Sequence, residues 1–185
     1  MKILVLGGGP AGLYFAISMK IRDASHDITI LERNKSDDTF GWGVVLSDET
    51  LDNLRANDPV SEEVIRSHFA YWDDIAVYHD GVRTVSSGHG FCGIGRKQFL
   101  LDLQARALEL GVKINFSSEA ESADHYMHDY DLVVASDGLN SKTRTTLAEH
   151  FQPNIDVRLC KFVWLGTHQK FDDAFTFIFE HTEHG

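Results

Sequence analysis

The stretch LVLGGGPAGLYF, residues 4–15, decides the fold of this chain, because it places four of the fifteen glycines within six residues, directly after an apolar run. A short apolar run bounded by glycines is typical of a buried parallel strand. Pro10 can open a helix, since its missing amide hydrogen costs nothing in the first turn. Leu13, Ile17 and Ile21 then recur at roughly helical spacing. The stretch therefore predicts a strand, a glycine-rich turn and a helix.

The same order of strand and helix continues along the chain. Residues 27–31, within HDITILER, indicate a second strand, which completes a unit of about thirty residues and implies a parallel sheet. Residues 99–110 show an amphipathic helical pattern that stops at Gly111, residues 112–116 alternate as a strand, and DLVVASDG again places a glycine after a strand. The sequence therefore predicts an α/β fold with a Rossmann-like domain built on a parallel sheet.

An antiparallel pattern interrupts this organisation. IAVYHDGVRTVSS alternates around Asp80 and Gly81, which predicts a two-residue hairpin turn. Two serines are expected to cap the amino ends of short helices, Ser47 and Ser61. Two apolar-rich segments are expected to form antiparallel strands, residues 160–167 and residues 174–181. The last of these has no visible partner, so the chain is expected to be a fragment of a longer protein.

Composition and charge argue against several classes of partner. With 43% apolar and 24% charged residues, the chain is typical of a globular protein. Its net charge of -11 argues against nucleic acid and against an anionic membrane surface, because both require a basic footprint. Cys92 and Cys160 lie far apart, and neither they nor the ten histidines show the spacing of metal ligands. We therefore expect a cytoplasmic protein without a disulfide or a metal site.

The glycine loop predicts a dinucleotide site. Gly7, Gly9 and Gly12 satisfy the GxGxxG pattern, which allows a tight turn, close approach of the backbone to a diphosphate and close packing of helix on strand. Glu32 follows Gly12 by twenty residues, where a carboxylate can accept hydrogen bonds from a ribose. A carboxylate here disfavours a 2′-phosphate, which predicts FAD or NAD rather than NADP. The alternative is a solvated Glu32 paired with Arg33.

A second group of polar residues is expected at the same edge of the sheet. In DLVVASDG a buried strand brings Asp137 and Gly138 to its carboxyl end, the edge where Gly7 and Glu32 also lie. Arg96 precedes the amphipathic helix and could donate to phosphate oxygens through its planar guanidinium group. Taken alone, Asp137 and Gly138 are also compatible with an ordinary turn.

Four stretches together resemble the FAD-dependent aromatic hydroxylases of the p-hydroxybenzoate hydroxylase type, namely LGGGPAGLYFA, LERN, GIGRKQFLLDLQ and DLVVASDGLNSKTR. The resemblance implies a glutathione-reductase-like FAD-binding domain, residues 1–70 and 88–155, and part of an antiparallel substrate-domain sheet, residues 71–87 and 156–185. It also implies that FAD contacts Gly7, Gly9, Pro10, Ala11, Gly12, Glu32, Arg33, Arg96, Asp137 and Gly138. The family's later GD motif, which holds the flavin, is not found in these 185 residues.

The resemblance further implies a monooxygenase that uses NAD(P)H and O2 to hydroxylate a small aromatic substrate. DDTFGWGVVLSDETLDNLRANDPV, GHGFCGIGRK and FVWLGT are similar to hydroxylases of aryl-CoA esters such as salicylyl-CoA or 2-aminobenzoyl-CoA. From the glycine pattern and Glu32 alone, an NAD-dependent dehydrogenase and a dinucleotide-binding module without catalysis are alternatives. Trp42 is expected either along the flavin or nicotinamide path or as a buried anchor. Three further aromatic residues are expected in the core, Trp72, Phe91 and Trp164.

Overall fold

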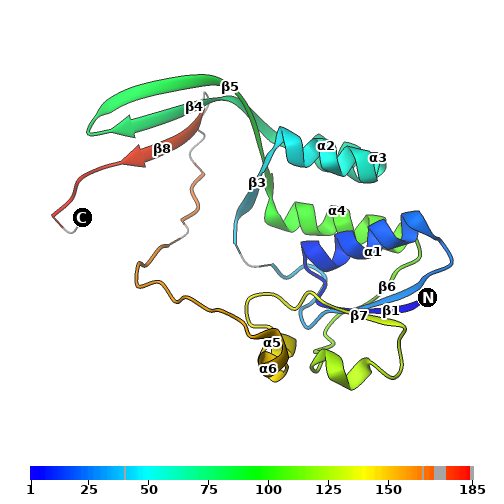
Figure 1. Ribbon diagram of the computed structural model, residues 1–185. Coiled ribbons are helices and arrows are strands. Elements are labelled where there is room, and N and C mark those ends of the chain that lie inside the picture. The colour runs from blue at the N-terminus through cyan, green and yellow to red at the C-terminus, as the bar shows by residue number, and fades with distance from the viewer. Residues whose placement is uncertain (40, 164, 169–173, 184–185) are drawn as a thin grey trace. The chain divides into compact units, whose positions relative to one another are not determined.

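The chain divides into two compact units, which the computed structural model shows in Figure 1. The structure describes residues 1–39, 41–163, 165–168 and 174–183. The first unit comprises Met1–Phe40 and Lys97–Val163, and the second comprises Gly41–Arg96 and Trp164–Gly185. These units are defined by the tertiary contacts within each of them, and their boundaries differ from those of the predicted domains. The functional division into an FAD-binding and a substrate domain stays a prediction.

The first unit is built on a four-stranded parallel sheet with strand order β6-β2-β1-β7. Its strands are β1 (Lys2–Leu6), β2 (Asp27–Leu31), β6 (Lys113–Asn115) and β7 (Leu132–Ala135). Both faces of β1 are covered, and its residues from Ile3 to Leu6 are fully buried, which is why this strand is an unbroken apolar run. The predicted parallel sheet is confirmed.

Helices cover both faces of this sheet. α1 (Pro10–Arg22) and α4 (Arg96–Glu109) lie on one face, and the short 3-10 helix η1 (Ala123–Tyr126) lies on the other (Figure 1). Leu4 and Leu6 of β1 belong to the apolar cluster on the η1 side. Successive side chains of a strand point to opposite faces of the sheet. The residues of β1 that alternate with Leu4 and Leu6 therefore face α1.

Two short helices follow β7. These are α5 (Lys142–Thr146) and α6 (Ala148–Phe151). Ser141 precedes α5, and its hydroxyl oxygen accepts a hydrogen bond from the Arg144 amide at 3.0 Å, which is the usual role of a serine at this position. None of the helices in the described part of the chain combines the length and the apolar character that spanning a bilayer requires.

The second unit contains a mixed sheet with strand order β3-β5-β4-β8. Its strands are β3 (Gly43–Ser47), β4 (Ala70–His79), β5 (Val82–Gly95) and β8 (Phe175–Phe179). β3 and β4 pair antiparallel with β5, but β8 pairs parallel with β4. The strand expected within residues 174–181 is present, but its expected antiparallel direction is wrong, and it does have a partner, β4, a hundred residues earlier. Residues 160–163 and 165–167, in the other expected strand, have no regular secondary structure.

The predicted hairpin is confirmed. β4 and β5 are joined by a two-residue turn in which Asp80 has φ 48° and Gly81 has φ 77°. Positive φ values at both central positions define a type I′ turn, whose twist matches that of the two strands. Glycine and aspartate are among the residues that adopt this conformation most readily.

Two helices follow β3, namely α2 (Asp48–Asn57) and α3 (Pro59–Ser67). Ser47 caps α2 as predicted, because its Oγ accepts a hydrogen bond from an amide of the first turn at 3.4 Å. The predicted cap at Ser61 is wrong, since α3 already begins at its proline. The Ser61 hydroxyl instead donates to the buried carboxylate of Asp58 at 2.6 Å.

A buried carboxylate joins α2 to α3. The side chain of Glu62 is 7% exposed and accepts hydrogen bonds from Arg55 of α2, at 3.1 Å, and from Arg66 of α3. Burial by itself raises the pKa of Glu62, but the hydrogen bonds from Arg55 and Arg66 lower it more, so that its pKa lies below the ordinary value. Ionised Glu62 therefore stabilises the packing of these helices.

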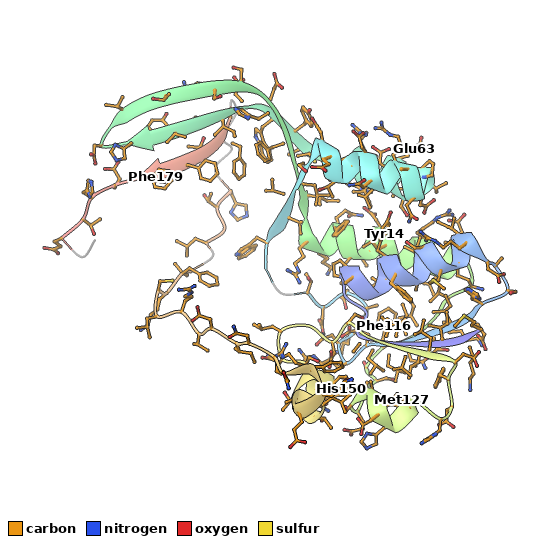
Figure 2. All side chains as sticks on the ribbon, viewed as in Figure 1. Tyr14, Glu63, Phe116, Met127, His150 and Phe179 are labelled. Atoms are coloured by element: carbon orange, nitrogen blue, oxygen red, sulfur yellow. The ribbon has the colours of Figure 1, made fainter. Side chains whose placement is uncertain are left out.

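We expect Glu62→Gln to lower the free energy of unfolding by about 1–3 kcal/mol, because it removes hydrogen bonds to a charged group. A depressed carboxyl pKa contributes stability above the unfolded-state pKa and loses it as pH falls through the folded-state pKa. The difference in Tm between wild type and variant should therefore shrink on acidification, as followed by circular dichroism. Glu63→Gln is the matched control, since Glu63 is exposed (Figure 2). A pH-independent difference would contradict this role.

Candidate functional site

The strand order identifies one edge of the parallel sheet as the place for a ligand. From β1 the chain passes to β2 and β6 on one side and later to β7 on the other side. In open parallel sheets, ligands bind at such a reversal of direction, outside the carboxyl ends of the strands. Gly7 directly follows β1, Glu32 follows β2 and Ser136 follows β7. Three loops with polar groups therefore meet at this edge.

Three glycines of the loop have different structural roles. Gly7 has φ 104°, and a Cβ there would lie 2.5 Å from the carbonyl oxygen of Ser136. A Cβ at Gly12 would lie 2.1 Å from the carbonyl oxygen of Gly7, so the close packing of α1 on the loop requires glycine. A Cβ at Gly9 would meet nothing within 4 Å. Open space therefore borders the loop at Gly9, where a ligand can approach the backbone.

The amino end of α1 can bind an anion. Gly9 precedes the helix and provides no side-chain cap, and Pro10 has no amide hydrogen. The first amide to bond back along the helix is that of Leu13, which donates to the Gly9 carbonyl at 3.0 Å. The amides of Ala11 and Gly12 have no acceptor within the helix, as is general for a first turn. Together with the helix dipole, they favour a negatively charged group at this end.

The carboxylate of Glu32 is fixed at the glycine loop. Its Oε2 accepts a hydrogen bond from the Gly8 amide at 2.7 Å. Its Oε1 accepts from the backbone amide of Asn34 at 2.7 Å and from the Asn34 side chain at 2.8 Å. A carboxylate has about four acceptor positions, so about one remains for a further donor. The arrangement can therefore hold a sugar hydroxyl next to the loop without moving Glu32.

Sequence reasoning missed the role of the second glycine of the loop. A Cβ at Gly8 would lie 2.9 Å from Cβ and 3.2 Å from Cγ of Glu32. Glycine at this position therefore allows the Glu32 side chain to cross the loop and reach the amide of Gly8. The run of three glycines, longer than GxGxxG requires, was the signal that could have indicated this contact.

Ser136 was also missed, and it joins β7 to the glycine loop. Its Oγ lies 3.0 Å from the carbonyl oxygens of both Leu6 and Gly7, and its single hydroxyl hydrogen is shared between them. The next residue, Asp137, accepts a hydrogen bond from the Thr143 amide at 3.4 Å. Gly138 has φ 78°, as in the ordinary turn considered for this motif. The structure thus places Asp137 beside Gly7, and its carboxylate already accepts a hydrogen bond from the Thr143 amide.

We expect Ser136→Ala to lower the free energy of unfolding by about 1 kcal/mol, because a partly buried hydrogen bond is lost. The loop should also become more mobile, so that the amide of Gly8 exchanges its hydrogen faster in nuclear magnetic resonance experiments. Ser118→Ala is the control, since the Ser118 hydroxyl donates to a carbonyl only two residues away, at 3.2 Å. Equal exchange rates in the two variants would contradict the joining role of Ser136.

The structure does not connect the two predicted arginines with the loop. The side chain of Arg33 is exposed, and Arg96 belongs to the second unit, where its amide donates to the Trp42 carbonyl at 3.0 Å. Contacts of these arginines with a dinucleotide stay predictions. The Trp42 side chain is 68% exposed, so the buried-anchor interpretation is wrong.

The aromatic residues of the second unit form a cluster on its sheet. Trp72 and Phe91 are half-buried, and each ring centroid lies 5.8 Å from that of Phe175. Phe177 continues the row along β8, with its ring 5.2 Å from that of Phe175. Trp72 and Phe91 therefore pack in an aromatic cluster, but they are half-buried and do not belong to the buried core in which they were expected. Trp164 lies outside the described residues.

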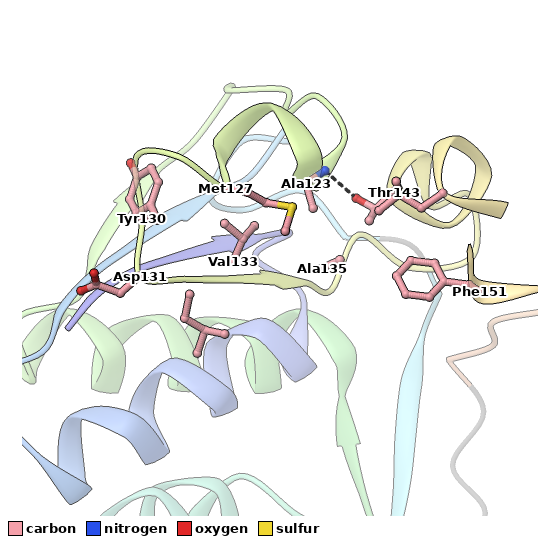
Figure 3. Close-up of a pocket in the computed structure, with 10 residues that line it drawn as sticks. Ala123, Met127, Tyr130, Asp131, Val133, Ala135, Thr143 and Phe151 are labelled. Atoms are coloured by element: carbon pink, nitrogen blue, oxygen red, sulfur yellow. Dashed lines mark hydrogen bonds between the residues drawn. The ribbon is translucent and has the colours of Figure 1, made fainter. Parts of the chain in front are cut away.

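A separate pocket of about 400 Å³ lies beside β7 in the first unit (Figure 3). Its walls are mostly apolar and include Met127, Val133 and Phe151. The acidic residue on its wall, Asp131, accepts a hydrogen bond from the Lys2 amide at 2.7 Å. The walls hold no lysine or arginine. Their chemistry does not suit a diphosphate, so this pocket is not a candidate for the dinucleotide site.

Known proteins similar to this chain are hydroxylases and monooxygenases by name. No protein-family model matches the chain. The chain is 42% identical over 185 residues to a salicyloyl-CoA 5-hydroxylase of a Streptomyces species, covering all of this chain and 35% of that protein. It is 34% identical over 180 residues to the protodeoxyviolaceinate monooxygenase of Chromobacterium violaceum, covering 93% of this chain and 46% of that protein. The chain thus spans less than half the length of these relatives.

Solved structures agree with the fold. The oxygenase of 2-methyl-3-hydroxypyridine-5-carboxylic acid matches with a TM-score of 0.69 and 25% sequence identity, over 79% of this chain and 42% of that chain. The predicted fold class, a Rossmann-like parallel sheet with part of a second sheet, is confirmed. The homologues and structural neighbours are FAD-dependent monooxygenases and oxygenases, as the sequence resemblance implied.

Proposed function

From its homology to part of the FAD-dependent monooxygenases, we propose that this chain forms the FAD-binding portion of an enzyme that hydroxylates an aromatic substrate. The observation that carries the proposal is the contact between Glu32 and the glycine loop. Oε2 of Glu32 lies 2.7 Å from the amide nitrogen of Gly8, at the carboxyl edge of the sheet. A dinucleotide-binding sheet uses this combination of glycine loop and strand-end carboxylate.

The glycine loop supports binding of the diphosphate of FAD. The amides of Ala11 and Gly12, in the first turn of α1, would donate to its oxygens, and the open space at Gly9 leaves room for them. The helix dipole adds about 0.3–1 kcal/mol of attraction for a negative charge near the surface. Ala11 is exposed and small, so its side chain would not block this approach.

Glu32 supports binding of the adenosine half of FAD. Its free acceptor position would take a ribose hydroxyl, while Gly8 and Asn34 hold its two oxygens in place. A 2′-phosphate would bring a second negative charge against this carboxylate, which favours FAD over a 2′-phosphorylated nucleotide. The side chain of Asp137 and the backbone of Gly138 would lie along the same edge of the sheet.

FAD, when bound, would supply the redox chemistry that activates O2 at the expense of NAD(P)H. The residues of this chain would bind and orient the cofactor. The proposed substrate is an aryl-CoA ester such as salicylyl-CoA or 2-aminobenzoyl-CoA. The 42% identity to salicyloyl-CoA 5-hydroxylase, which extends over the whole of this chain, supports that proposal.

The proposal is tested by the visible spectrum of the purified chain after incubation with FAD and removal of the free cofactor. We expect a flavin absorption band that stays with the protein and that excess ADP reduces, because ADP would compete for the glycine loop. A colourless protein that binds NADH would support a dehydrogenase instead. A protein that binds neither cofactor would support a module without catalysis and overturn the proposal for this chain.

The substrate is tested separately, in a protein that contains this chain together with the remaining length of its relatives. Salicylyl-CoA or 2-aminobenzoyl-CoA should stimulate its oxidation of NADH, and a hydroxylated product should appear. Salicylate without CoA is the matched control and should stimulate much less. A protein that binds FAD but responds to neither ester would overturn the substrate and leave the cofactor proposal intact.

A further inference from the structure

We propose that His79, Asp80 and His181 form a binding site for a divalent transition-metal ion of the Zn²⁺ type on the second unit. Their side chains offer two imidazole nitrogens and one carboxylate oxygen, all within 4.8 Å of one another. Imidazole and carboxylate groups are ligands that such ions take in proteins. The spacing of these residues in the sequence does not predict a metal site, because the third ligand lies about a hundred residues from the other two.

Backbone pairing brings the three residues together. β4 and β8 run parallel, and the last pair of their register joins His79 to Phe179, which is labelled in Figure 2. The Asp80 amide donates to the Phe179 carbonyl at 3.4 Å, so the hairpin turn is tied to the end of β8. His181 follows Phe179 by two residues. The sheet and the type I′ turn therefore fix the positions of His79 and Asp80, and they bring the end of β8, which His181 follows, next to the turn.

The side chains are close enough to share one ion. Nδ1 of His79 lies 3.7 Å from Oδ2 of Asp80. The rings of His79 and His181 have centroids 6.0 Å apart and an angle of 76° between their planes. Around a tetrahedral ion with bonds of about 2.1 Å, ligand atoms lie about 3.4 Å apart. The His79 and Asp80 side chains are 66% and 50% exposed, so small rotations can close the remaining gap.

The surroundings leave room for an ion and its water molecules. A pocket of about 450 Å³ is lined by His79, Ile178, Phe179, Glu180 and His181. Water can occupy the coordination positions that three protein ligands leave open. Glu180, which also lines this pocket, carries a negative charge that favours a cation.

A single pair of histidine and carboxylate is not sufficient for this inference. His125 and Asp124 have the same spacing, with Nδ1 and Oδ1 3.7 Å apart, but the described residues offer them no third ligand. Among the residues that the structure describes, only the cluster of His79, Asp80 and His181 brings three such groups together. A bound ion would clamp the end of β8 to the hairpin turn and so stabilise the second unit.

The experiment is a calorimetric titration of the tag-free chain with ZnCl2. We expect one Zn²⁺ per chain and a rise in Tm with Zn²⁺ concentration. His181→Ala and Asp80→Asn should each weaken Zn²⁺ binding at least about tenfold. Both positions are exposed, and asparagine also tolerates positive φ, so the variants should keep the circular dichroism spectrum of the wild type. His125→Ala should bind Zn²⁺ as the wild type does.

Binding elsewhere on the chain would overturn the proposal. The amino terminus is the principal competing place, since its nitrogen lies 3.3 Å from Nδ1 of His26, which is 3.7 Å from Oδ2 of Asp23. The proposal is wrong if Zn²⁺ binding survives in His181→Ala, or if His26→Ala removes it. No detectable binding to the wild type would equally overturn it. None of these outcomes depends on FAD binding by the first unit.

Discussion

Replacing Gly12 with alanine is expected to weaken FAD binding strongly and to destabilise the first unit. The added Cβ would lie 2.1 Å from the Gly7 carbonyl oxygen and 2.6 Å from Oγ of Ser136. The first neighbour is backbone at the end of the central strand, so α1 itself must shift. Overpacking of this kind typically costs about 1–3 kcal/mol. The shift would also displace the amides proposed to hold the diphosphate, and FAD affinity should fall by about a hundredfold or more.

Gly9→Ala is the matched control for this prediction. Its Cβ would meet nothing within 4 Å, and Gly9 has φ -73°, which alanine adopts without strain. The free energy of unfolding should therefore stay within about 0.5 kcal/mol of the wild type. FAD affinity should still fall, because the methyl group would enter the space proposed for the ligand. Chemical denaturation and FAD titration of both variants check the pair. A Gly12→Ala protein with wild-type stability and FAD affinity would contradict the packing argument.

Glu32→Gln is expected to have the second-largest effect, although it only replaces one carboxylate oxygen with an NH2 group. Both oxygens of Glu32 accept hydrogen bonds from N–H groups, at Gly8 and at Asn34. The glutamine amide must therefore turn an NH2 group toward one of these donors. We expect a loss of about 1–3 kcal/mol in the free energy of unfolding, because a buried donor loses its acceptor. ADP affinity should fall about tenfold or more, because the ribose acceptor is disturbed.

The same substitution should change nucleotide preference. The wild type is expected to bind ADP more tightly than 2′-phospho-ADP, since Glu32 repels a 2′-phosphate. In Glu32→Gln this difference should shrink, because the repelling charge is gone. Glu149→Gln is the control, as Glu149 is an exposed residue of α6. If the wild type bound both nucleotides equally, or Glu32→Gln kept the full preference, Glu32 would not lie next to the ribose.

The first unit could be predicted well from the sequence because its signals are local. The helix predicted to open at Pro10 does begin there, and the second strand covers Asp27–Leu31 as predicted. An apolar run, a proline at the first helical position and a glycine loop act within a few residues of one another. The hairpin turn at Asp80 and Gly81 belongs to the same class of local signal.

Long-range pairing could not be predicted in the same way. Residues 175–179 have the composition of a strand, but nothing in them indicates β4 as the partner or a parallel direction. β3 was missed, because a stretch of five residues that starts with glycine gives little periodicity. The cap predicted at Ser61 is wrong because Asp58 and Pro59 form the stronger start signal for α3.

The candidate site shows the same limit at the level of single residues. Glu32 could be anticipated, because its distance from the glycine loop is set by one strand–helix–strand unit. Ser136 could not, since it contacts the Gly7 carbonyl from a strand almost 130 residues later. The GxGxxG pattern does not require glycine at position 8, so it gives no reason to single out Gly8. The requirement for glycine there comes from the Glu32 side chain, which crosses the loop at this point.

The most direct test of the central claim is a crystal structure of the chain with bound ADP. We predict that the diphosphate oxygens accept hydrogen bonds from the amides of Ala11 and Gly12, and that a ribose hydroxyl donates to Glu32. The contacts of Glu32 with Gly8 and Asn34 should persist in that complex. A diphosphate bound away from the amino end of α1, or a ribose that does not contact Glu32, would contradict the account.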